Sequence, residues 1–496
     1  MRLWIGLYLP RLPLEVFCPR WSAEAATVVL EQECVLAASP MAAGAGVRAG
    51  MRRGGALMLA PGARVLERSS QREHEALQAV ALALLQYTPL VAQGEESTLL
   101  MDVGASLRLF GGVRPLCRRI RADLRALGFS SALACAPTAR GAWLLARHGG
   151  ARVLKMASLE RRLARLPCQL LPPARPYQAW FDGIGCVTVG ELRRLPRPGL
   201  QRRCGRALLD MLDAAHGMAP ELFDWTAPPP TFHARIELFD RIEQADLLLC
   251  AAHRLLLQMT GWLCAHQLAV ERIDLLLEHE RGRVAMAPTV LEIALAEPTW
   301  RDEHLLRLLR ERLGQLTLDA PVIALGLAAL QVQAMAPPNA TLFPEPGASA
   351  QDQARLFELL VARLGPENVL QAAPLADYRP ELANRWLPLQ HKVGAAARAA
   401  QLPPDLATLA RPAWLLAKPV ALLMREHRPF YGSPLRMAGG PERIEAGWWN
   451  GPQTRDYFIA EGAEHAYYWV YRERLVGQAG EGEAREPRWF LHGLFA

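Results

Sequence analysis

The sequence predicts a multidomain α+β protein. Its 496 residues are too many for one ordinary hydrophobic core, and 51% of them are hydrophobic, which is typical of a folded chain. Predicted strands alternate with predicted helices up to about residue 165, and a second series of strands and helices lies between residues 232 and 334. We therefore expect several domains of different architecture.

The first domain is expected over residues 1–165. Apolar runs predict strands at 3–9, 98–103 and 131–136 and a strand or hairpin at 27–37, and helical spacing of apolar residues predicts helices at 73–87, 115–127 and 139–148. Strands that alternate with helices in this way predict an α/β layer, in which helices cover a sheet.

The second region, residues 166–228, is rich in arginine and in short helices broken by Gly and Pro. Ten Arg lie between Arg161 and Arg206, against only Asp182 and Glu191. The glycine-rich run 183–190, followed by 191–195, has the form of a helix-hairpin-helix turn, whose backbone amides can approach a DNA phosphate at a helix start. The candidate DNA-binding residues are Gly183, Gly185, Gly190, Arg193, Arg194, Arg202, Arg203 and Arg206. A structural turn with solvated arginines is the alternative.

Three further regions complete the chain. Residues 229–336 predict the order βαββαβ, a compact sheet with two helices. Residues 337–433 are rich in Pro, Ala and Gly and predict a linker with one helix at 350–363.

The last region, residues 434–496, predicts a small β-rich module. Eleven of the 35 aromatic residues of the chain lie between residues 447 and 496, which is the last tenth, and the alternation over 467–472 is typical of a strand. An exposed docking face for partner proteins would use Trp448, Trp449, Trp489, Phe490 and Phe495. Packing of these rings in a core is the alternative.

Composition limits the class of protein. A net charge of +7 is modest for this length, so local clusters of cations matter more than the total. Nine cysteines without a Cys-x-x-Cys pair predict neither a disulfide framework nor a zinc site. The first residues contain no long apolar core, and no run elsewhere reaches membrane-spanning length, so we expect a cytoplasmic protein without a cleavable leader, a membrane anchor, a metal or another cofactor.

The order of these regions resembles a Y-family translesion DNA polymerase. The resemblance implies a palm over 1–165 with UmuC-like fingers inserted at about 15–75, a helix-hairpin-helix thumb, and a βαββαβ little finger. The local sequences 46–51, 107–111 and 134–137 agree with this family. The blocks 3–14, 106–112, 440–449 and 488–495 are similar to the polymerase-like subunits of bacterial mutagenesis cassettes.

The catalytic acids of that family are missing. Transfer of a phosphoryl group by such a polymerase uses two divalent metals held by carboxylates. The resemblance places the first acid within Leu7–Leu9, which contains none, and the later Asp-Glu pair on Ser97 and Thr98. Neutral hydroxyls cannot offset the repulsion between two cations. The resemblance also places the triphosphate contacts on Pro40, Ala43 and Ala139, which cannot serve.

Three nearby acids could be considered as substitutes. Glu95 and Glu96 precede the expected positions by one or two residues, and a bulge could turn one of them inward. Asp102 matches a non-catalytic acid of the family and is expected to be structural. A weakly active polymerase that uses displaced carboxylates is therefore one alternative, and a general DNA-binding scaffold is another.

The resemblance also implies protein partners. The run 339–344 resembles the peptide that binds the sliding clamp (the DNA polymerase III beta subunit), with Leu342 and Phe343 as apolar anchors and Asn339 in place of the usual Gln. A second match, 353–357, lies in the predicted helix, where Leu356, Phe357, Leu360 and Val361 have the spacing of a packed face. The expected function is an inactive adaptor that binds damaged primer-template DNA and the clamp, and recruits an error-prone DnaE-type polymerase and a RecA-like accessory protein.

Overall fold

The computed structural model describes residues 2–22, 25–280, 287–335, 350–375, 377–389, 410–447, 449, 453–474 and 488–495. The chain forms two compact units, Met1–Arg363 and Leu364–Ala496. Each unit is described by itself.

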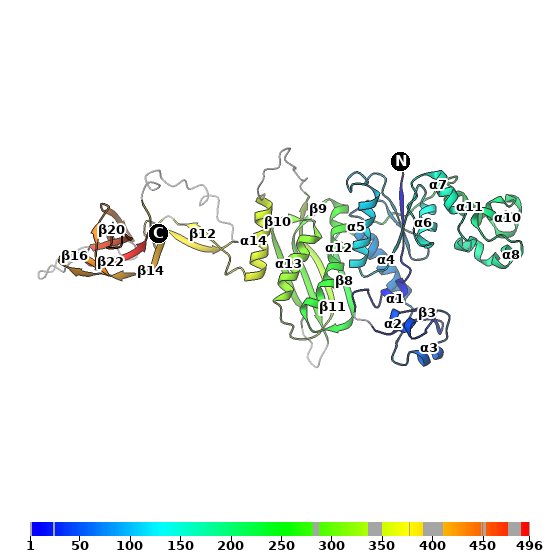
Figure 1. The fold of residues 1–496 in the computed structure, drawn as a ribbon, viewed down its shortest axis with the longest axis horizontal. Coiled ribbons are helices and arrows are strands. Elements are labelled where there is room, and N and C mark those ends of the chain that lie inside the picture. Colours follow the sequence, from blue (N-terminus) through cyan, green and yellow to red (C-terminus); the bar gives the residue numbers. More distant parts are fainter. Residues whose placement is uncertain are drawn as a thin grey trace. The chain divides into compact units, whose positions relative to one another are not determined.

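A four-stranded antiparallel sheet forms the palm-like unit. Its strands run in the order β5 (Val91–Gln93), β6 (Thr98–Asp102), β1 (Trp4–Tyr8) and β7 (Ala132–Ala136). Helices α4 (Ser70–Leu84) and α5 (Val113–Ala126) cover one face, and α6 (Ala139–Arg147) covers the other (Figure 1). The predicted α/β layer is confirmed.

Alternation along β1 explains these two layers. Ile5 and Leu7 point into the core shared with α4 and α5, whereas Trp4 belongs to the core on the α6 side. Gly6 lies against α6 so closely that a Cβ atom would overlap the carbonyl oxygen of Ala142. The glycine therefore lets the helix approach the sheet.

A small finger-like subdomain is inserted after β1 and α1 (Leu12–Glu15). It contains β2 (Thr27–Glu31), β3 (Cys34–Ala38), α2 (Pro40–Gly44), α3 (Arg53–Leu59) and β4 (Arg64–Glu67), and the sheet order is β3-β2-β4. The predicted hairpin is present, and β4, α2 and α3 were not predicted. These short elements bury a core of only seven residues, so their apolar pattern is weak.

The thumb-like unit is built from short helices that continue the palm core. They are α7 (Met156–Leu163), α8 (Gln178–Gly183), α9 (Val189–Arg194), α10 (Arg197–Cys204) and α11 (Arg206–Ala215), with 3-10 turns at Cys168–Leu170 and Pro172–Tyr177. Leu159, Phe181 and Leu208 share one buried cluster with Trp143 of α6. The thumb-like helices are therefore anchored to the palm-like unit by side-chain packing.

The predicted βαββαβ order is found in the little-finger-like unit. It comprises β8 (His233–Ile242), a 3-10 turn (Ala245–Leu248), α12 (Leu249–His266), β9 (Leu268–His279), β10 (Thr289–Thr299), α13 (Asp302–Gly314) and β11 (Val322–Ala334). The sheet order is β10-β9-β11-β8, and α12 and α13 cover one face (Figure 1). β8 therefore lies at an edge of the sheet.

Helix α12 also packs against the palm-like unit. Leu257 joins the core beneath α4 and α5, and a Cβ atom on Gly261 would overlap the carbonyl oxygen of Leu82. The stretch Ala245–His266 is the one candidate for a membrane span among the described residues, with a mean hydropathy of 1.3. Since 72% of the 18-residue window that meets this criterion is buried in the fold, the stretch packs as a core helix.

Helix α14 (Ala350–Leu364) follows the little-finger-like unit. Leu359 and Ala362 pack against the core of that unit, and Val361 is also buried. The expectation that Leu356 belongs to the packed face is wrong, because 54% of this residue is exposed. The packed face of the helix therefore includes Leu359 and Ala362 and leaves out Leu356.

The second unit is rich in strands. A hairpin pairs β12 (Leu370–Pro374) with β13 (Asn384–Pro388). The main sheet has the order β14 (Trp414–Ala421), β22 (Trp489–Leu494), β21 (Tyr467–Arg474), β20 (Gln453–Glu461) and β18 (Arg436–Met437), and β19 (Glu442–Ala446) also pairs with β20. A three-stranded sheet contains β15 (Leu423–Arg425), β16 (Arg428–Tyr431) and β17 (Ser433–Pro434).

The expectation of a linker over 337–433 is therefore wrong for the residues of β12 to β16. β14 pairs with β22, the last of the described strands. The local sequence around β14 is rich in Pro and Ala and does not predict a strand, because the pairing partner lies far away in the sequence. The β-rich module begins before residue 434.

Candidate functional site

The resemblance places the missing acids where β6 begins, at Thr98, on the face of the palm-like sheet that α6 covers. Thr98 pairs directly with Tyr8 across β6 and β1. The Thr98 side chain is buried and its hydroxyl donates to the carbonyl oxygen of Glu95 at 2.5 Å, while Trp143 Nε1 donates to the same oxygen at 3.1 Å. A hydroxyl and aromatic rings therefore occupy the place where the family resemblance expects carboxylates.

Glu96 is held by two arginines. Its carboxylate pairs with Arg147 of α6, and with both terminal nitrogens of Arg175 at 2.5 and 3.0 Å. Burial raises the pKa of Glu96, but the hydrogen bonds and charges of Arg175 and Arg147 outweigh it, so the pKa lies below the usual value. Arg147 also stacks over Tyr8 and Trp143, with its guanidinium 5.7 and 4.8 Å from the ring centres.

Glu95 also faces an arginine. Its carboxylate lies 3.6 Å from Arg140, which also approaches Glu221 at 3.9 Å. The turn that carries both acids has positive φ angles of 55° at Glu96 and at Ser97, outside the strand conformation. A dinuclear Mg²⁺ site does not fit here, because one candidate carboxylate, Glu96, is held by two arginines and the other, Glu95, faces Arg140.

Asp102 lies at the other end of β6, opposite Trp4. Its carboxylate accepts a hydrogen bond from the Gly104 amide at 3.1 Å and approaches Arg2 at 3.8 Å. Within the described residues, no group of three or more His, Cys, Asp or Glu side chains is placed to hold a metal ion. Asp102 shapes the turn after the strand.

The three positions at which the resemblance places the triphosphate contacts lie on helices α2 and α6. Pro40 and Ala43 lie on the exposed helix α2, and neither side chain carries a hydrogen-bonding group. Ala139 is the first residue of α6 and is buried in the core between the sheet and the thumb-like helices. A lysine at this position would have to leave that core.

The hairpin between α8 and α9 adopts the predicted turn. Gly185 has a φ of +71°, and a Cβ atom on Gly190 would lie 2.7 Å from the carbonyl oxygen of Ala164, whereas Gly183 faces open space. Glu191 closes the turn by accepting the amides of Val187 and Thr188, both at 2.9 Å.

The remaining amides of the turn have partners within the chain as well. Those of residues 184–186 donate to carbonyl oxygens of α8, and those of Val189 and Gly190 donate to Leu166 and Ala164. A phosphate at this turn would have to displace the Glu191 carboxylate. The exposed arginines around the turn are therefore the stronger candidates for DNA contact.

These arginines differ in their surroundings. Arg203 stacks over Trp180 at 4.7 Å, and Arg206 approaches Asp210 at 3.4 Å. Arg193, Arg194 and Arg202 are exposed, and no described carboxylate forms an ion pair with any of them. Exposed cations without an ion-pair partner suit a polyanion.

The outer face of the little-finger-like sheet has the opposite character. Arg235 pairs with Glu278 and Glu237 at 2.8 and 3.1 Å, and Arg272 pairs with Glu292 at 2.9 Å. Both of these cations meet a carboxylate of another strand, so they offer little net attraction for phosphates.

The predicted peptide for the sliding clamp, with Asn339, Leu342 and Phe343, lies outside the described residues. The second match, at 353–357, lies on α14, where Gln353 and Leu356 are exposed and Phe357 is half-buried. A helical segment does not present the extended backbone that such a peptide needs.

The aromatic residues of the C-terminal module divide into core and surface. Tyr457, Trp469 and Tyr471 are buried, and the rings of Tyr457 and Trp469 stack at 4.1 Å. Of the predicted docking residues, three are half-buried and pack against the two cores of the module, namely Trp489, Phe490 and Phe495. Trp449 is 61% exposed and Trp448 lies outside the described residues.

Two features of the site were not predicted. Sequence reasoning missed Arg147 and Arg175 as the partners of Glu96, because residues 51 and 79 positions away meet only in the folded chain. It also missed a cleft between α4 and β8. The high arginine content of residues 161–206 was a sequence signal for Arg175 alone.

The palm-like sheet, the helix-hairpin-helix unit and the βαββαβ unit together define a protein with the architecture of a Y-family DNA polymerase, without free carboxylates at the position of the family's acids. The sequence profile of the impB/mucB/samB family matches residues 16–147. The chain is similar to Protein ImuB of Caulobacter vibrioides, from strain NA1000 and from strain CB 15. It is 28% identical to each over 473 residues, which cover 91% of this chain and 100% of the relative.

Solved structures with lower similarity were also found. A ternary complex of Dbh is 16% identical and covers 66% of this chain and 98% of its own, with a TM-score of 0.37. DinB from Sulfolobus solfataricus is 15% identical and covers 66% of this chain and 100% of its own, also with a TM-score of 0.37.

Proposed function

We propose that this chain is a catalytically inactive, polymerase-like adaptor in error-prone translesion synthesis and damage-induced mutagenesis. The observation that carries the proposal is the ion pairing of Glu96 with Arg147 and Arg175 beside the buried Thr98. Similarity to ImuB over nearly the whole chain supports the same class of function.

The electrostatics of the vacated position support inactivity. Two divalent cations need several carboxylates to offset their mutual repulsion. Here Glu95 and Glu96 face three arginines, and Tyr8 and Thr98 bring no charge. To release Glu96 for a metal, Arg147 and Arg175 would lose their shared partner in a partly buried place, which is unfavourable.

The thumb-like unit would bind DNA in this proposal. Arg193, Arg194 and Arg202 offer exposed cations without ion-pair partners among the described residues, and Arg203 and Arg206 lie beside them. Contacts of this kind read phosphates rather than bases. The glycines at 183, 185 and 190 would then shape the hairpin rather than hold the phosphate.

The remaining parts would recruit partners. The peptide around Leu342 and Phe343 would bind the sliding clamp, and the C-terminal module with the exposed Trp449 would dock the DnaE-type polymerase and the RecA-like accessory protein ImuA. The DnaE-type polymerase would then perform synthesis on the damaged template.

A primer-extension assay tests the proposal. The full chain is incubated with primer-template DNA, nucleotides and Mg²⁺ or Mn²⁺, with an active Y-family polymerase as the positive control. We expect no template-dependent product. Extension that disappears in the Glu95→Ala, Glu96→Ala double variant would mean a weakly active polymerase.

A pull-down from damaged cells separates the adaptor from a general DNA-binding scaffold. The adaptor is expected to retain the clamp and the DnaE-type polymerase after nuclease treatment. Loss of both proteins when DNA is digested would favour the scaffold.

A further inference from the structure

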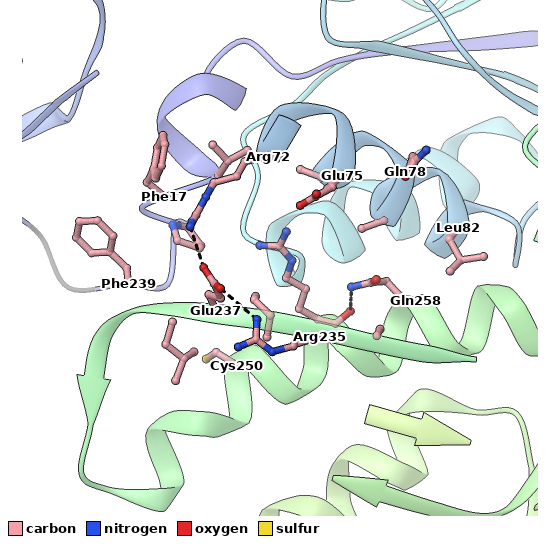
Figure 2. A pocket seen from close by; sticks show the side chains of 18 of the residues that line it. Phe17, Arg72, Glu75, Gln78, Leu82, Arg235, Glu237, Phe239, Cys250 and Gln258 are labelled. Carbon is pink, nitrogen blue, oxygen red and sulfur yellow. Dashed lines mark hydrogen bonds and ion pairs between the residues drawn. The ribbon is translucent and has the colours of Figure 1, made fainter. Parts of the chain in front are cut away.

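A cleft of about 1470 Å³ lies between the finger and palm elements and the little-finger-like unit. Helix α4 forms one wall, and strand β8 with helix α12 forms the other (Figure 2). Residues of both faces of β8 line it, such as Arg235 and Glu237 from the outer face and Ile236 and Leu238 from the inner face. The cleft therefore runs along the edge of the strand.

The edge of β8 is open on the side of the cleft. Among the described strands, β8 pairs with β11 alone, and it is ten residues long. An edge strand presents a row of main-chain donors and acceptors that can pair with an added extended peptide.

Arg254 of α12 lines the same cleft and lacks a counter-charge. Only 8% of this residue is exposed, and its guanidinium lies 4.9 Å from the ring centre of Phe129. No described carboxylate forms an ion pair with it, and burial lowers its pKa to about 10, so it remains charged at neutral pH. A buried cation without a partner is unfavourable for folding.

Trp21 is a second side chain of the cleft wall that carries a donor without an acceptor among the described residues. The Nε1 atom of Trp21 is buried, has no hydrogen-bond partner among the described residues, and belongs to a side chain that lines the cleft. It would lie 2.9 Å from a Cβ atom on Gly128, the neighbour of the Phe129 that Arg254 covers. Arg254 and Trp21 both line the cleft, and among the described residues the first has no ion pair and the Nε1 atom of the second has no acceptor.

We propose that this cleft binds an extended peptide of a partner protein, which pairs with the edge of β8 and places a carboxylate side chain on Arg254. The carboxylate supplies the charge that Arg254 lacks. The open edge selects an extended main chain, which favours a peptide over a nucleotide strand.

The rim of the cleft permits entry of such a peptide. Arg72 of α4 reaches Glu237 of β8 at 2.8 Å, as Figure 2 shows, and Arg64 reaches Asp240 at 2.7 Å. All four side chains are more than 40% exposed. Because exposed ion pairs contribute little, a strand that enters can displace them at small cost.

The test uses a fluorescent library of synthetic nine-residue peptides, each with alternating apolar residues and one Asp or Glu. The matched control of each is the same peptide with Asn or Gln. We measure anisotropy with the full chain and expect some peptides to bind at least tenfold more tightly in the acid form. In the Arg254→Met variant this preference should fall below twofold, and N-methylation of alternate peptide amides should abolish binding.

Three outcomes overturn the proposal. These are a library without acid preference, an acid preference that survives Arg254→Met, and displacement of bound peptides by a nine-residue oligothymidine from the wild type but not from the variant. The last would make the cleft a nucleic-acid site.

Thermal unfolding separates binding from a structural role of Arg254. If the cation serves a ligand, Arg254→Met should keep or raise the midpoint temperature of the full chain, since the variant no longer buries a lone charge. A fall of several degrees would make Arg254 a packing residue and contradict the proposal.

Discussion

Glu96 and Arg175 form a two-point ion pair that joins the turn before β6 to the thumb-like unit. The two donor–acceptor distances are 2.5 and 3.0 Å, and Arg147 of the palm-like unit completes the pair from the other side. The position at which a polymerase of this architecture keeps its acids is thereby part of the connection between two units. The ion pairs of Glu96 should therefore contribute to the stability of the folded chain.

Glu96→Gln should lower the free energy of unfolding of the full chain by about 1–2 kcal/mol. The expected loss is small for a residue with two ion pairs because 30% of the Glu96 side chain is exposed and solvent screens its charge. The pKa of Glu96 is lowered in the folded chain, so its contribution is present above the ordinary pKa of a glutamate and is lost as the pH falls through the folded value. Urea unfolding at neutral and acidic pH measures both effects. Glu95→Gln is the control and should change little, since Glu95 is 55% exposed and lies 3.6 Å from its arginine.

The Arg193→Ala, Arg194→Ala variant should weaken DNA binding and reduce its salt dependence. Each lost phosphate contact lowers the slope of log K against log salt by about 0.9, so a change of about 1 to 2 is expected. The matched control is Arg235→Ala, Arg272→Ala, since both of these arginines are ion-paired on the little-finger-like sheet. An equal change in the control would argue against the thumb as the DNA-binding unit.

The Leu342→Ala, Phe343→Ala variant should lose binding to the purified sliding clamp, because the two apolar anchors would no longer fill their pocket. Surface plasmon resonance with the full chain measures the loss. Leu356→Ala on α14 is the control, since this side chain is exposed and its removal leaves the helix packed. Unchanged clamp binding by the double variant would show that the peptide lies elsewhere.

Asp456→Asn should destabilise the C-terminal module by about 3 kcal/mol, because three arginines lose one buried counter-charge. Burial raises the pKa of Asp456, but hydrogen bonds from Arg443, Arg472 and Arg474 outweigh it and lower the pKa to about 2. The stabilisation is therefore present above about pH 4 and is lost as the pH falls toward 2. Unfolding followed by tryptophan fluorescence measures it, with the exposed Glu445→Gln as the control.

Gly261→Ala should loosen the contact between α12 and α4, because the added methyl group would overlap the carbonyl oxygen of Leu82. A cost of about 2–3 kcal/mol is expected from such overpacking. Gly55→Ala in α3 is the control, since nothing lies within 4 Å of its Cβ position and alanine favours the helix by about 0.5–1 kcal/mol. Chemical denaturation of the full chain compares the two variants.

Most of the first unit could be predicted from the sequence. The strands at Trp4–Tyr8 and Thr98–Asp102, the helix over Ser70–Leu84 and the βαββαβ unit follow from apolar periodicity, because each buries one face over many residues. The finger-like subdomain was predicted only as a hairpin, and strands β12 to β16 were missed. Their pairing partners are distant in sequence or their buried faces are small.

The residue types of the candidate site could also be predicted from the sequence, whereas the contacts between them could not. The sequence by itself determined that Ser97 and Thr98 carry no charge and that arginines gather around the hairpin, since residue types are fixed before folding. Only the tertiary structure decided which side chains meet. Arg147 and Arg175 form ion pairs with Glu96, Glu191 accepts hydrogen bonds from the hairpin amides, and Arg254 has no ion-pair partner among the described residues. An ion pair depends on a few ångströms between side chains that lie far apart in the chain, and no local pattern encodes that distance.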